Sequence, residues 1–264
     1  RNPDRNILCS GGVLFNQSCG KKETKEKRAW IIMEKKKPLQ ADLEQMEELQ
    51  NITQPFMQML MEYQCAMEEV ATKLKNLNEE FALLYNRNPF ETIKTRLKRP
   101  TSILEKMKRR GFAVTIDNMR RELTDIAGVR VICSFQEDIY TLADLLLEQD
   151  DIRLIQKKDY IKNPKPNGYR SLHLIVEVPV FLSSGKLLRK VEIQFRTIAM
   201  DFWASLDHKL RYKKDLQNGE VIAAQLKECA DAISGIDEKM QDILIQIEGD
   251  DEPKRKRFSN LEEE

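Results

Sequence analysis

The sequence predicts an α/β (α+β) fold, in which a mixed sheet of about five strands is surrounded by helices and carries helical extensions at both ends. Two segments, 171–182 and 187–196, alternate apolar and polar residues with the period of two that is typical of strands with one buried face. A third, 129–135, is apolar almost throughout, which indicates a strand covered on both faces. Apolar residues recur at spacings of three and four from Phe56 to Leu84 and from Ile222 to Ile247, which indicates long amphipathic helices.

Length and composition limit the possible functions. A chain of 264 residues can bury one core and carry a helical appendage. Its net charge of +1 argues against a general nucleic-acid binder. The charge is uneven, however, since eight Lys or Arg and one acid lie between Lys94 and Arg110. This local excess favours a polyanionic ligand over a long duplex, although a solvated basic helix face would show the same pattern.

Cysteine and histidine usage indicates the compartment and the kind of metal. The five cysteines are scattered without any C-x-x-C spacing, which predicts reduced thiols in the cytoplasm and no structural zinc. No apolar run reaches the ~20 residues that span a bilayer, so no membrane segment is expected. Because His173 and His208 are the two histidines, a histidine-based metal site is not expected. A catalytic metal would be a hard ion with oxygen ligands, for which Mg²⁺ is the expected choice.

The first 90 residues are expected to be an irregular leader followed by helices. Residues 1–33 show no regular period and are interpreted as a disordered leader or tag. Residues 34–90 form a helical region, in which a helix over 39–52 precedes a second helix that begins near Pro55. The apolar stripe of this second helix continues to Leu84. The stripe has two interpretations, packing against the chain's own domain and formation of a subunit interface.

Residues 91–215 are interpreted as the core domain. Ser102, with Glu105 three residues later, forms a capping-box pattern that predicts a helix from Ser102 to about Arg110. A helix N-terminus attracts phosphate. Capping does not explain why three cations, Arg96, Lys98 and Lys106, lie close to the N-terminus of this predicted helix.

Strands and helices then alternate to the end of the chain. An irregular connection with a short helix near Asn118 leads into the strand at 129–135. The other predicted strands are 152–162, 171–182 and 187–196, and the other predicted helices are 138–149, 200–212 and 221–247. A hairpin turn at 183–186 joins the last two strands. The last helix lies in the C-terminal segment 216–249, and the charged tail 250–264 is expected to be disordered.

The loop that leads into the strand at 171–182 presents an aromatic ring and a histidine beside cations. Proline and glycine keep the loop irregular, Lys165 and Arg170 flank Tyr169, and His173 follows on the same face. An aromatic face flanked by cations suits a nucleotide, because the base can stack while the phosphates are neutralised. The alternative is an ordinary loop whose tyrosine caps the core.

Two further segments carry carboxylates on or before strands. The apolar residues of the strand 187–196 point one way, and Glu192, Gln194 and Arg196 form a polar row on the other face. Upstream, Asp125 and a glycine turn lead into the first predicted strand. Taken singly, the aspartate could be a turn cap and the glutamate a solvated strand residue.

In this order and spacing, the three segments resemble the synthetase domain of the RelA/SpoT family. From residue 34 to residue 249 the chain resembles the small alarmone synthetases, the short form without hydrolase or regulatory domains. The resemblance implies a nucleotidyltransferase-like sheet and GTP/GDP 3′-pyrophosphokinase activity. Such an enzyme transfers pyrophosphate from ATP to the ribose 3′-hydroxyl of GDP or GTP, so that ppGpp or pppGpp forms and AMP leaves, with Mg²⁺ as the cofactor.

The resemblance also implies roles for individual residues. Asp125 would hold Mg²⁺ against the donor phosphates, and Glu192 would share the ion or act as the base toward the acceptor hydroxyl. Arg96 and Arg130 would sandwich the donor adenine. The implied ATP-binding set is Arg96, Lys98, Ser102, Lys106 and Arg130. The implied GDP/GTP-binding set is Lys165, Tyr169, His173, Gln194 and Asp201.

Within the acceptor set, Tyr169 would stack on the guanine, and Gln194 would position the acceptor or its ribose. His173 is left open between a direct ligand contact and a structural histidine. Asp201 departs from the pattern, because relatives often carry Asn beside the guanine at this position. An aspartate could still accept hydrogen bonds from guanine N1–H and the 2-amino group.

The resemblance leaves two alternative functions open. One is a pyrophosphokinase that acts on another 3′-hydroxyl, of an adenine nucleotide or a tRNA. The other is a non-catalytic nucleotide-binding or RNA-binding module. The helical ends predict a homo-oligomer, and the resemblance implies a homotetramer in which a cleft between subunits could bind (p)ppGpp as an allosteric ligand.

Overall fold

The computed structural model describes residues 25–211 and 219–249 of the chain. The chain divides into two compact units, residues 1–53 and 54–264, and the site discussed below lies in the second. The elements are α1 (Lys25–Tyr85), β1 (Phe90–Leu97), α2 (Pro100–Arg109), α3 (Ile116–Glu122), β2 (Ala127–Cys133), α4 (Gln136–Leu147), β3 (Arg153–Asp159), β4 (Leu172–Leu182), β5 (Gly185–Thr197), α5 (Ile198–Arg211) and α6 (Gly219–Gly249). None of the helices among these residues is long and apolar enough to cross a membrane.

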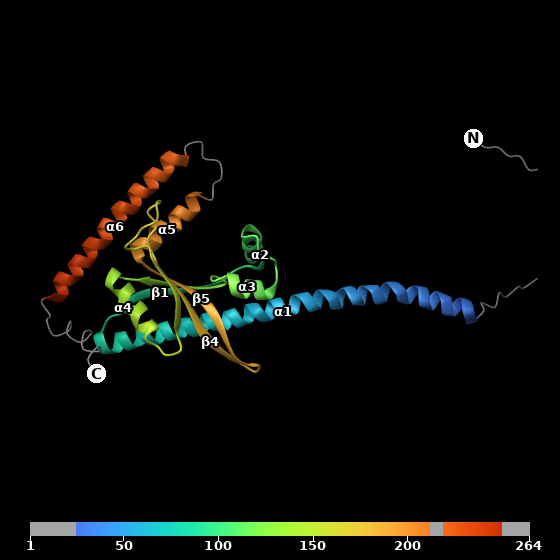
Figure 1. The fold of residues 1–264 in the computed structure, drawn as a ribbon. Helices are drawn as coiled ribbons and strands as arrows, with labels where there is room; N and C mark the ends of the chain where they lie inside the picture. Colours follow the sequence, from blue (N-terminus) through green and yellow to red (C-terminus); the bar gives the residue numbers. More distant parts are fainter. Residues whose placement is uncertain (1–24, 212–218, 250–264) are drawn as a thin grey trace, which may run out of the picture. The chain divides into compact units, whose positions relative to one another are not determined.

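The strands form one mixed sheet of five in the order β1-β2-β5-β4-β3 (Figure 1). The central pair β2 and β5 is parallel, and the other three pairs are antiparallel. The predicted fold class and sheet are therefore confirmed. The position of β1 was not predicted, because three of its eight residues are apolar and its cations were interpreted as the approach to a helix. Helices α3, α4 and α5 and strands β2, β3, β4 and β5 lie within a few residues of their predicted ranges.

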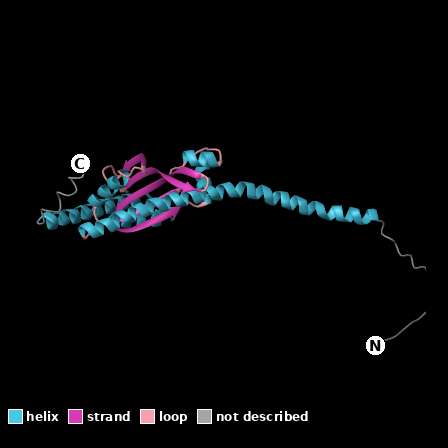
Figure 2. Ribbon diagram, turned by 90° about the horizontal axis from the view of Figure 1, so that it is seen from below, coloured by secondary structure: helices cyan, strands magenta, loops and turns pink. Residues whose placement is uncertain are grey.

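The core lies on one face of the sheet. The predicted apolar alternation is confirmed, since the side chains of Leu172, Leu174, Val176, Val178 and Val180 on β4 are all buried. Val191, Ile193 and Phe195 of β5 are buried beside them, together with apolar residues of α4 and of the second half of α1. Figure 2 shows this half of α1 passing across the strands. The opposite face of β5 carries the polar row of Glu192, Gln194 and Arg196. This face does not contribute to the core and can form a binding site.

Helix α1 differs from the prediction in one respect. It is continuous through Pro55, where a break between two helices was expected. Proline removes one backbone hydrogen bond, and the interaction of the following turns with the core outweighs this loss. In the stripe from Phe56 to Leu84, Tyr63, Val70 and Leu74 are fully buried in the chain's own core. The first interpretation of the stripe, packing against the domain, is thus the one that the structure supports.

The start of α2 also differs. The capping box at Ser102 and Glu105 is absent, because the helix begins at Pro100 with Arg99 as its N-cap and without a side-chain cap. Proline suits the first helical position, since its φ is already helical and the missing N–H would have no partner there. Near the N-terminus, α1 already begins at Lys25, inside the expected leader. Residues 1–24 of the leader and the tail 250–264 lie outside the described residues.

Candidate active site

The polar face of the sheet brings residues of four strands into two rows. In the first row, Lys94 of β1 lies opposite Arg130 of β2, Gln194 of β5 and His173 of β4 in register. In the second row, Arg96 lies opposite Gly128 and Glu192. A cavity of about 280 Å³ opens above these rows, lined by Lys94, Arg96, Lys98, Asp125, Gly128, Val129, Arg130, Glu192 and Gln194.

Gly128 contributes to the cavity by its lack of a side chain. A Cβ atom at this position would lie 3.6 Å from the carbonyl oxygen of Arg96 and 3.9 Å from that of Glu192, which is ordinary van der Waals contact. The backbone therefore does not require glycine here. The missing side chain instead leaves space between Arg96 and Glu192.

Asp125 lies between two lysines at one end of the cavity. Its Oδ2 accepts hydrogen bonds from Lys98 Nζ at 2.7 Å and Lys106 Nζ at 2.6 Å. Burial alone would raise the pKa of Asp125, but the two ammonium groups outweigh it and hold that pKa below its ordinary value. The other oxygen, Oδ1, is buried and has no hydrogen-bond partner among the described residues. Asp125 is thus an ionised carboxylate with one oxygen available to a further ligand.

Glu192, on β5, lines the cavity. Its Oε1 is 3.4 Å from His173 Nδ1, and its Oε2 accepts a hydrogen bond from Gln194 Nε2 at 2.9 Å. Burial would raise the pKa of Glu192, but His173 and Gln194 bring it below the usual range. The carboxylate is therefore ionised and can accept a proton or bind a cation, which are the two roles that the sequence left open.

Tyr169 and its neighbours form an aromatic group beside the cavity. Tyr169 Oη lies 2.8 Å from His173 Nε2, and Tyr160 packs edge-to-face against both rings. The ammonium of Lys165 lies 4.7 Å from the centroid of the Tyr169 ring and 4.5 Å from that of Tyr160. The predicted acceptor residues Lys165, Tyr169 and His173 therefore lie together.

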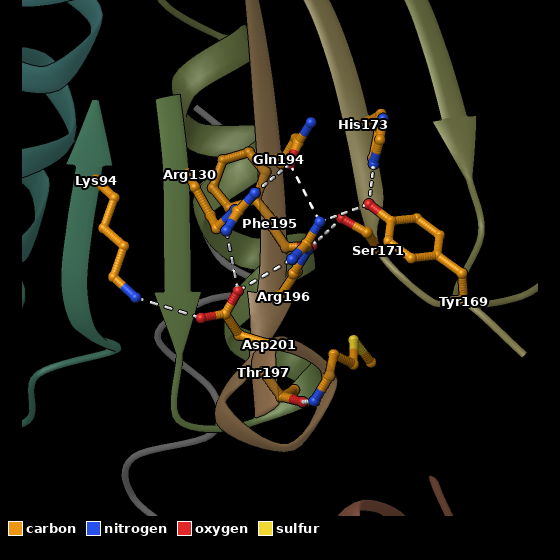
Figure 3. A network of polar contacts seen from close by, with 11 residues as sticks. Lys94, Arg130, Tyr169, Ser171, His173, Gln194, Phe195, Arg196, Thr197 and Asp201 are labelled. Atoms are coloured by element: carbon orange, nitrogen blue, oxygen red, sulfur yellow. Dashed lines mark hydrogen bonds and ion pairs between the residues drawn. The ribbon is translucent and has the colours of Figure 1, made fainter. Parts of the chain in front are cut away.

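Asp201, on α5, is buried under a cluster of cations (Figure 3). Its Oδ1 lies 3.0 Å from Arg196 Nη1 and 3.3 Å from Arg130 Nη1, and its Oδ2 lies 3.3 Å from Lys94 Nζ. Both carboxylate oxygens are thus already engaged by the protein. Burial and the neighbouring Arg196 lower the pKa of Arg130.

Of the predicted site residues, Ser102 is the one that neither lines the cavity nor has a described contact with another of them. It is half-buried on α2. Lys94 and Tyr160 were not predicted as site residues. Lys94 could have been found had β1 been recognised as a strand, because Arg96 and Lys98 share its alternation. Tyr160 follows an exposed edge strand, and no local pattern distinguishes it.

Helix α6 backs the loop that carries Lys165 and Tyr169. Gly168 has a φ of +86°, and a Cβ atom there would lie 2.5 Å from the Cβ of Ala230 on α6. Arg170 extends from the loop to Asp231 of α6, at 3.4 Å. The loop is therefore held against α6 by a contact that requires glycine.

Comparisons with known proteins agree with this geometry. Residues 95–217 match the family model described as "Region found in RelA / SpoT proteins". The chain is 42% identical to GTP pyrophosphokinase YwaC of Bacillus subtilis over 77% of this chain and 97% of YwaC. It is 36% identical to GTP pyrophosphokinase YjbM of the same organism over 72% of this chain and 88% of YjbM.

Solved structures give the same result. Small alarmone synthetase 2 from Bacillus subtilis matches with a TM-score of 0.64 and 43% identity, over 72% of this chain and 98% of that one. Small alarmone synthetase 1 from the same organism, bound to its product pppGpp, matches with a TM-score of 0.66 and 33% identity, over 73% of this chain and 98% of that one. The similarity covers almost the full length of these short proteins, and the chain therefore belongs to the RelA/SpoT family and, within it, to the small alarmone synthetases.

Proposed function

We propose that this protein is a GTP/GDP 3′-pyrophosphokinase that makes ppGpp and pppGpp. The observation that carries the proposal is the cavity itself, which joins the ionised carboxylates of Asp125 and Glu192 with cations on a single sheet face. Relatives named GTP pyrophosphokinases, and a structure of one small alarmone synthetase bound to pppGpp, support the choice of substrate.

On the donor side, the residues around Asp125 suit a triphosphate. Lys98 and Lys106 present two ammonium groups at one end of the cavity, where they would neutralise the phosphates of ATP. Arg96 and Arg130 stand on neighbouring strands and both line the cavity, and planar guanidinium groups can stack on an adenine ring. Ser102 stays a predicted donor residue on resemblance alone.

The donor set also fits Mg²⁺. Asp125 Oδ1 is a buried carboxylate oxygen without a partner among the described residues, and Glu192 is ionised in the same cavity. Mg²⁺ prefers such hard oxygen ligands and completes its shell with waters and phosphate oxygens, so two carboxylates suffice. Asp125 and Glu192 would hold the ion, which would neutralise charge on the transferring phosphates.

Transfer needs an in-line arrangement and the removal of one proton. The acceptor 3′-oxygen attacks the β-phosphorus of ATP, the bond from that phosphorus to the α–β bridging oxygen breaks, and AMP leaves. Glu192, held at both oxygens by His173 and Gln194, would take the hydroxyl proton. Tyr169 would stack on the guanine with Lys165 beside it, at the end of the cavity away from Asp125.

Incubation with radiolabelled ATP tests this function directly. The β-labelled or γ-labelled pyrophosphate should move to GDP and GTP in the presence of Mg²⁺, and AMP should appear in equal amount. Transfer of the label to the 3′-hydroxyl of ATP, AMP or a tRNA instead would identify the other pyrophosphokinase activity. Nucleotide or RNA binding without transfer to any acceptor would identify the non-catalytic module.

We also propose that the protein is a homo-oligomer, namely a homotetramer. The α1 stripe no longer argues for this, but α6 leaves Ile236, Met240, Ile243 and Ile247 at 47–67% exposure along one side. On α5, which lies alongside α6 in Figure 1, Phe202, Leu206 and Leu210 are exposed at the same helical spacing. Soluble proteins seldom expose such stripes, and closed symmetric assembly covers them. A regulatory (p)ppGpp site between subunits and a cytoplasmic location stay predictions.

Light scattering should give a mass several times that of one 30.9 kDa chain. Replacing Ile236 and Ile243 by Glu should reduce that mass, because the charges would face each other across the interface. Val114→Glu, at an exposed apolar position outside α5 and α6, is the matched control. A monomeric wild-type protein, or a double variant with unchanged mass, would exclude this interface.

Gly168→Ala should raise the KM for the acceptor about tenfold or more and leave the KM for ATP nearly unchanged. The new methyl group would collide with Ala230, so the loop that carries Tyr169 must move away from α6. Gly111→Ala is the control, because Gly111 also has a positive φ (+73°) but has no atom within 4 Å of the new Cβ.

Ala230→Gly in the Gly168→Ala background should recover part of the acceptor affinity, since it removes the atom that collides. The backbone strain at φ +86° would remain, at about 1–2 kcal/mol. Equal changes of both KM values in Gly168→Ala, or the same kinetics in Gly111→Ala, would show that the contact with α6 does not position the acceptor loop.

A further inference from the structure

Arg196, at the end of β5, has more polar contacts than any single local pattern predicts. Its side chain is 6% exposed, and a buried guanidinium is costly unless its donors are satisfied; both Nη atoms have partners, and Nε has none among the described residues. Nη1 donates to Asp201 Oδ1 at 3.0 Å, and Nη2 donates to Tyr169 Oη at 2.7 Å and to Gln194 Oε1 at 3.2 Å (Figure 3). Its Cζ lies 5.1 Å from the centroid of the Tyr169 ring.

The chemistry of arginine gives these hydrogen bonds a direction. A guanidinium has donors and no acceptor, so Tyr169 Oη accepts from Arg196, and the phenolic O–H is free to donate to His173 Nε2 at 2.8 Å. A neutral imidazole that accepts at Nε2 carries its proton on Nδ1. His173 Nδ1 lies 3.4 Å from Glu192 Oε1. Each group along the path Arg196–Tyr169–His173 therefore donates to the next, and the path ends 3.4 Å from the carboxylate of Glu192.

A second branch starts at the same guanidinium. Gln194 Oε1 receives N–H groups from both Arg196 and Arg130, so the oxygen of this amide faces the arginines. Its amino group is consequently turned toward Glu192 Oε2, to which it donates at 2.9 Å. With the two arginines replaced by water, the amide could flip and face the carboxylate with its oxygen.

We propose that Arg196 is a positioning residue for Glu192: it orients Tyr169 and Gln194 so that their two branches hold the two oxygens of the catalytic carboxylate, and Asp201 fixes Arg196 in turn. The inference rests on the proposed function of Glu192. It also gives Asp201 a role that differs from the predicted contact with guanine, because its oxygens are engaged by Arg196, Arg130 and Lys94.

The first test is kinetic. Arg196→Lys keeps a positive charge but cannot donate in fixed directions to three partners, and it should lower kcat about 10- to 100-fold with the KM for ATP nearly unchanged. Tyr169→Phe keeps the stacking ring and cuts one branch, and it should lower kcat about fivefold. Because both changes act on the same branch, the double variant should lose less than the product of the two single losses.

The control is Arg189→Lys. Arg189 is another arginine of β5, half-buried, and its Nε donates to the buried carboxylate of Glu62 on α1 at 2.9 Å, outside the cavity. We expect a lower Tm for this variant with kcat retained. If Arg196→Lys and Arg189→Lys show the same kinetic profile, or if Arg196→Lys keeps kcat within twofold of wild type, the positioning role is wrong.

The second test needs no substrate, so its failure is distinguishable from failure of the proposed function. Nitrogen-15 NMR of the wild-type protein, at a pH at which both imidazoles are neutral, reports the tautomer of each ring. The chain has two histidines, so a His208→Gln variant assigns the spectrum. The path from Arg196 requires the proton of His173 on Nδ1. A proton on Nε2 would reverse the direction of the branch and overturn the proposal, even if Arg196→Lys failed to fold.

Discussion

Replacement of Glu192 by Gln is expected to abolish pyrophosphate transfer while leaving ATP binding largely intact. The amide has nearly the same shape as the carboxylate, but it is neutral and far less basic. It can neither take the proton of the acceptor hydroxyl nor hold a cation. General-base catalysis contributes roughly 10²–10⁴-fold, so kcat should fall by at least this factor.

Local contacts should make the loss larger. Gln194 Nε2 now donates to a carboxylate oxygen at 2.9 Å, and the new amide would place its own N–H₂ group opposite one of the two donors. The measurement is single-turnover transfer from labelled ATP to GDP, with ATP binding followed separately by calorimetry with a non-hydrolysable analogue.

Glu177→Gln is the matched control. Glu177 is a carboxylate on the neighbouring strand β4 that pairs with Arg153, outside the cavity lining. The Glu177→Gln substitution removes the same charge from the sheet and should leave kcat close to the wild-type value. Near-wild-type turnover of purified Glu192→Gln would remove Glu192 from the catalytic centre, whereas a loss of ATP affinity equal to the loss of kcat would assign it to ground-state binding.

The parts of the site that lie along one strand could be predicted from the sequence. Alternation along β5 puts Glu192, Gln194 and Arg196 on one face whatever the neighbouring strands are, and the structure has them there. The same holds for the buried face of β4. Such periods are local properties of the chain, so they can be recognised without knowledge of the sheet order.

The contacts between strands could not be predicted in this way. The row Lys94–Arg130–Gln194–His173 exists because β1, β2, β5 and β4 are neighbours, and this order crosses the sequence order. The pairing of Asp125 with Lys98 and Lys106 likewise joins residues 27 and 19 positions apart. Resemblance to a family brought all of these residues except Lys94 into one predicted site, but it did not predict which carboxylate would be engaged by which cation.

The helices show a second limit. The stripe on α1 and the stripe on α6 have similar spacing, yet Tyr63 and Leu74 are fully buried whereas Ile236 and Ile247 are 60% and 67% exposed. Periodicity shows that a helix has an apolar face, but the surface that covers that face is decided by tertiary packing. This is why a subunit interface was expected at both ends and stays a prediction for the C-terminal one.

Asp125→Asn is expected to remove the Mg²⁺-dependent part of ATP binding and to lower transfer by a factor comparable to that for Glu192→Gln. Asp125 Oδ1 is the buried oxygen without a partner among the described residues, and the carboxamide that replaces this carboxylate is a poor ligand for a hard cation. ATP affinity should be measured by calorimetry across a Mg²⁺ titration, for the variant and for the wild type.

The Mg²⁺ titration of Asp125→Asn distinguishes a metal-ligand role of Asp125 from a counter-ion role toward its two lysines. Asp125 has a second possible role, as the counter-ion that restrains Lys98 and Lys106 at 2.7 and 2.6 Å. If that were its sole role, Asn would release both ammonium groups, ATP would bind more tightly without Mg²⁺, and the Mg²⁺ titration would keep its midpoint. Asp117→Asn is the control for the change of net charge, because the side chain of Asp117 is 90% exposed. A metal ligand predicts the opposite outcome in the titration: affinity without Mg²⁺ changes little, and the gain in affinity on adding Mg²⁺ disappears.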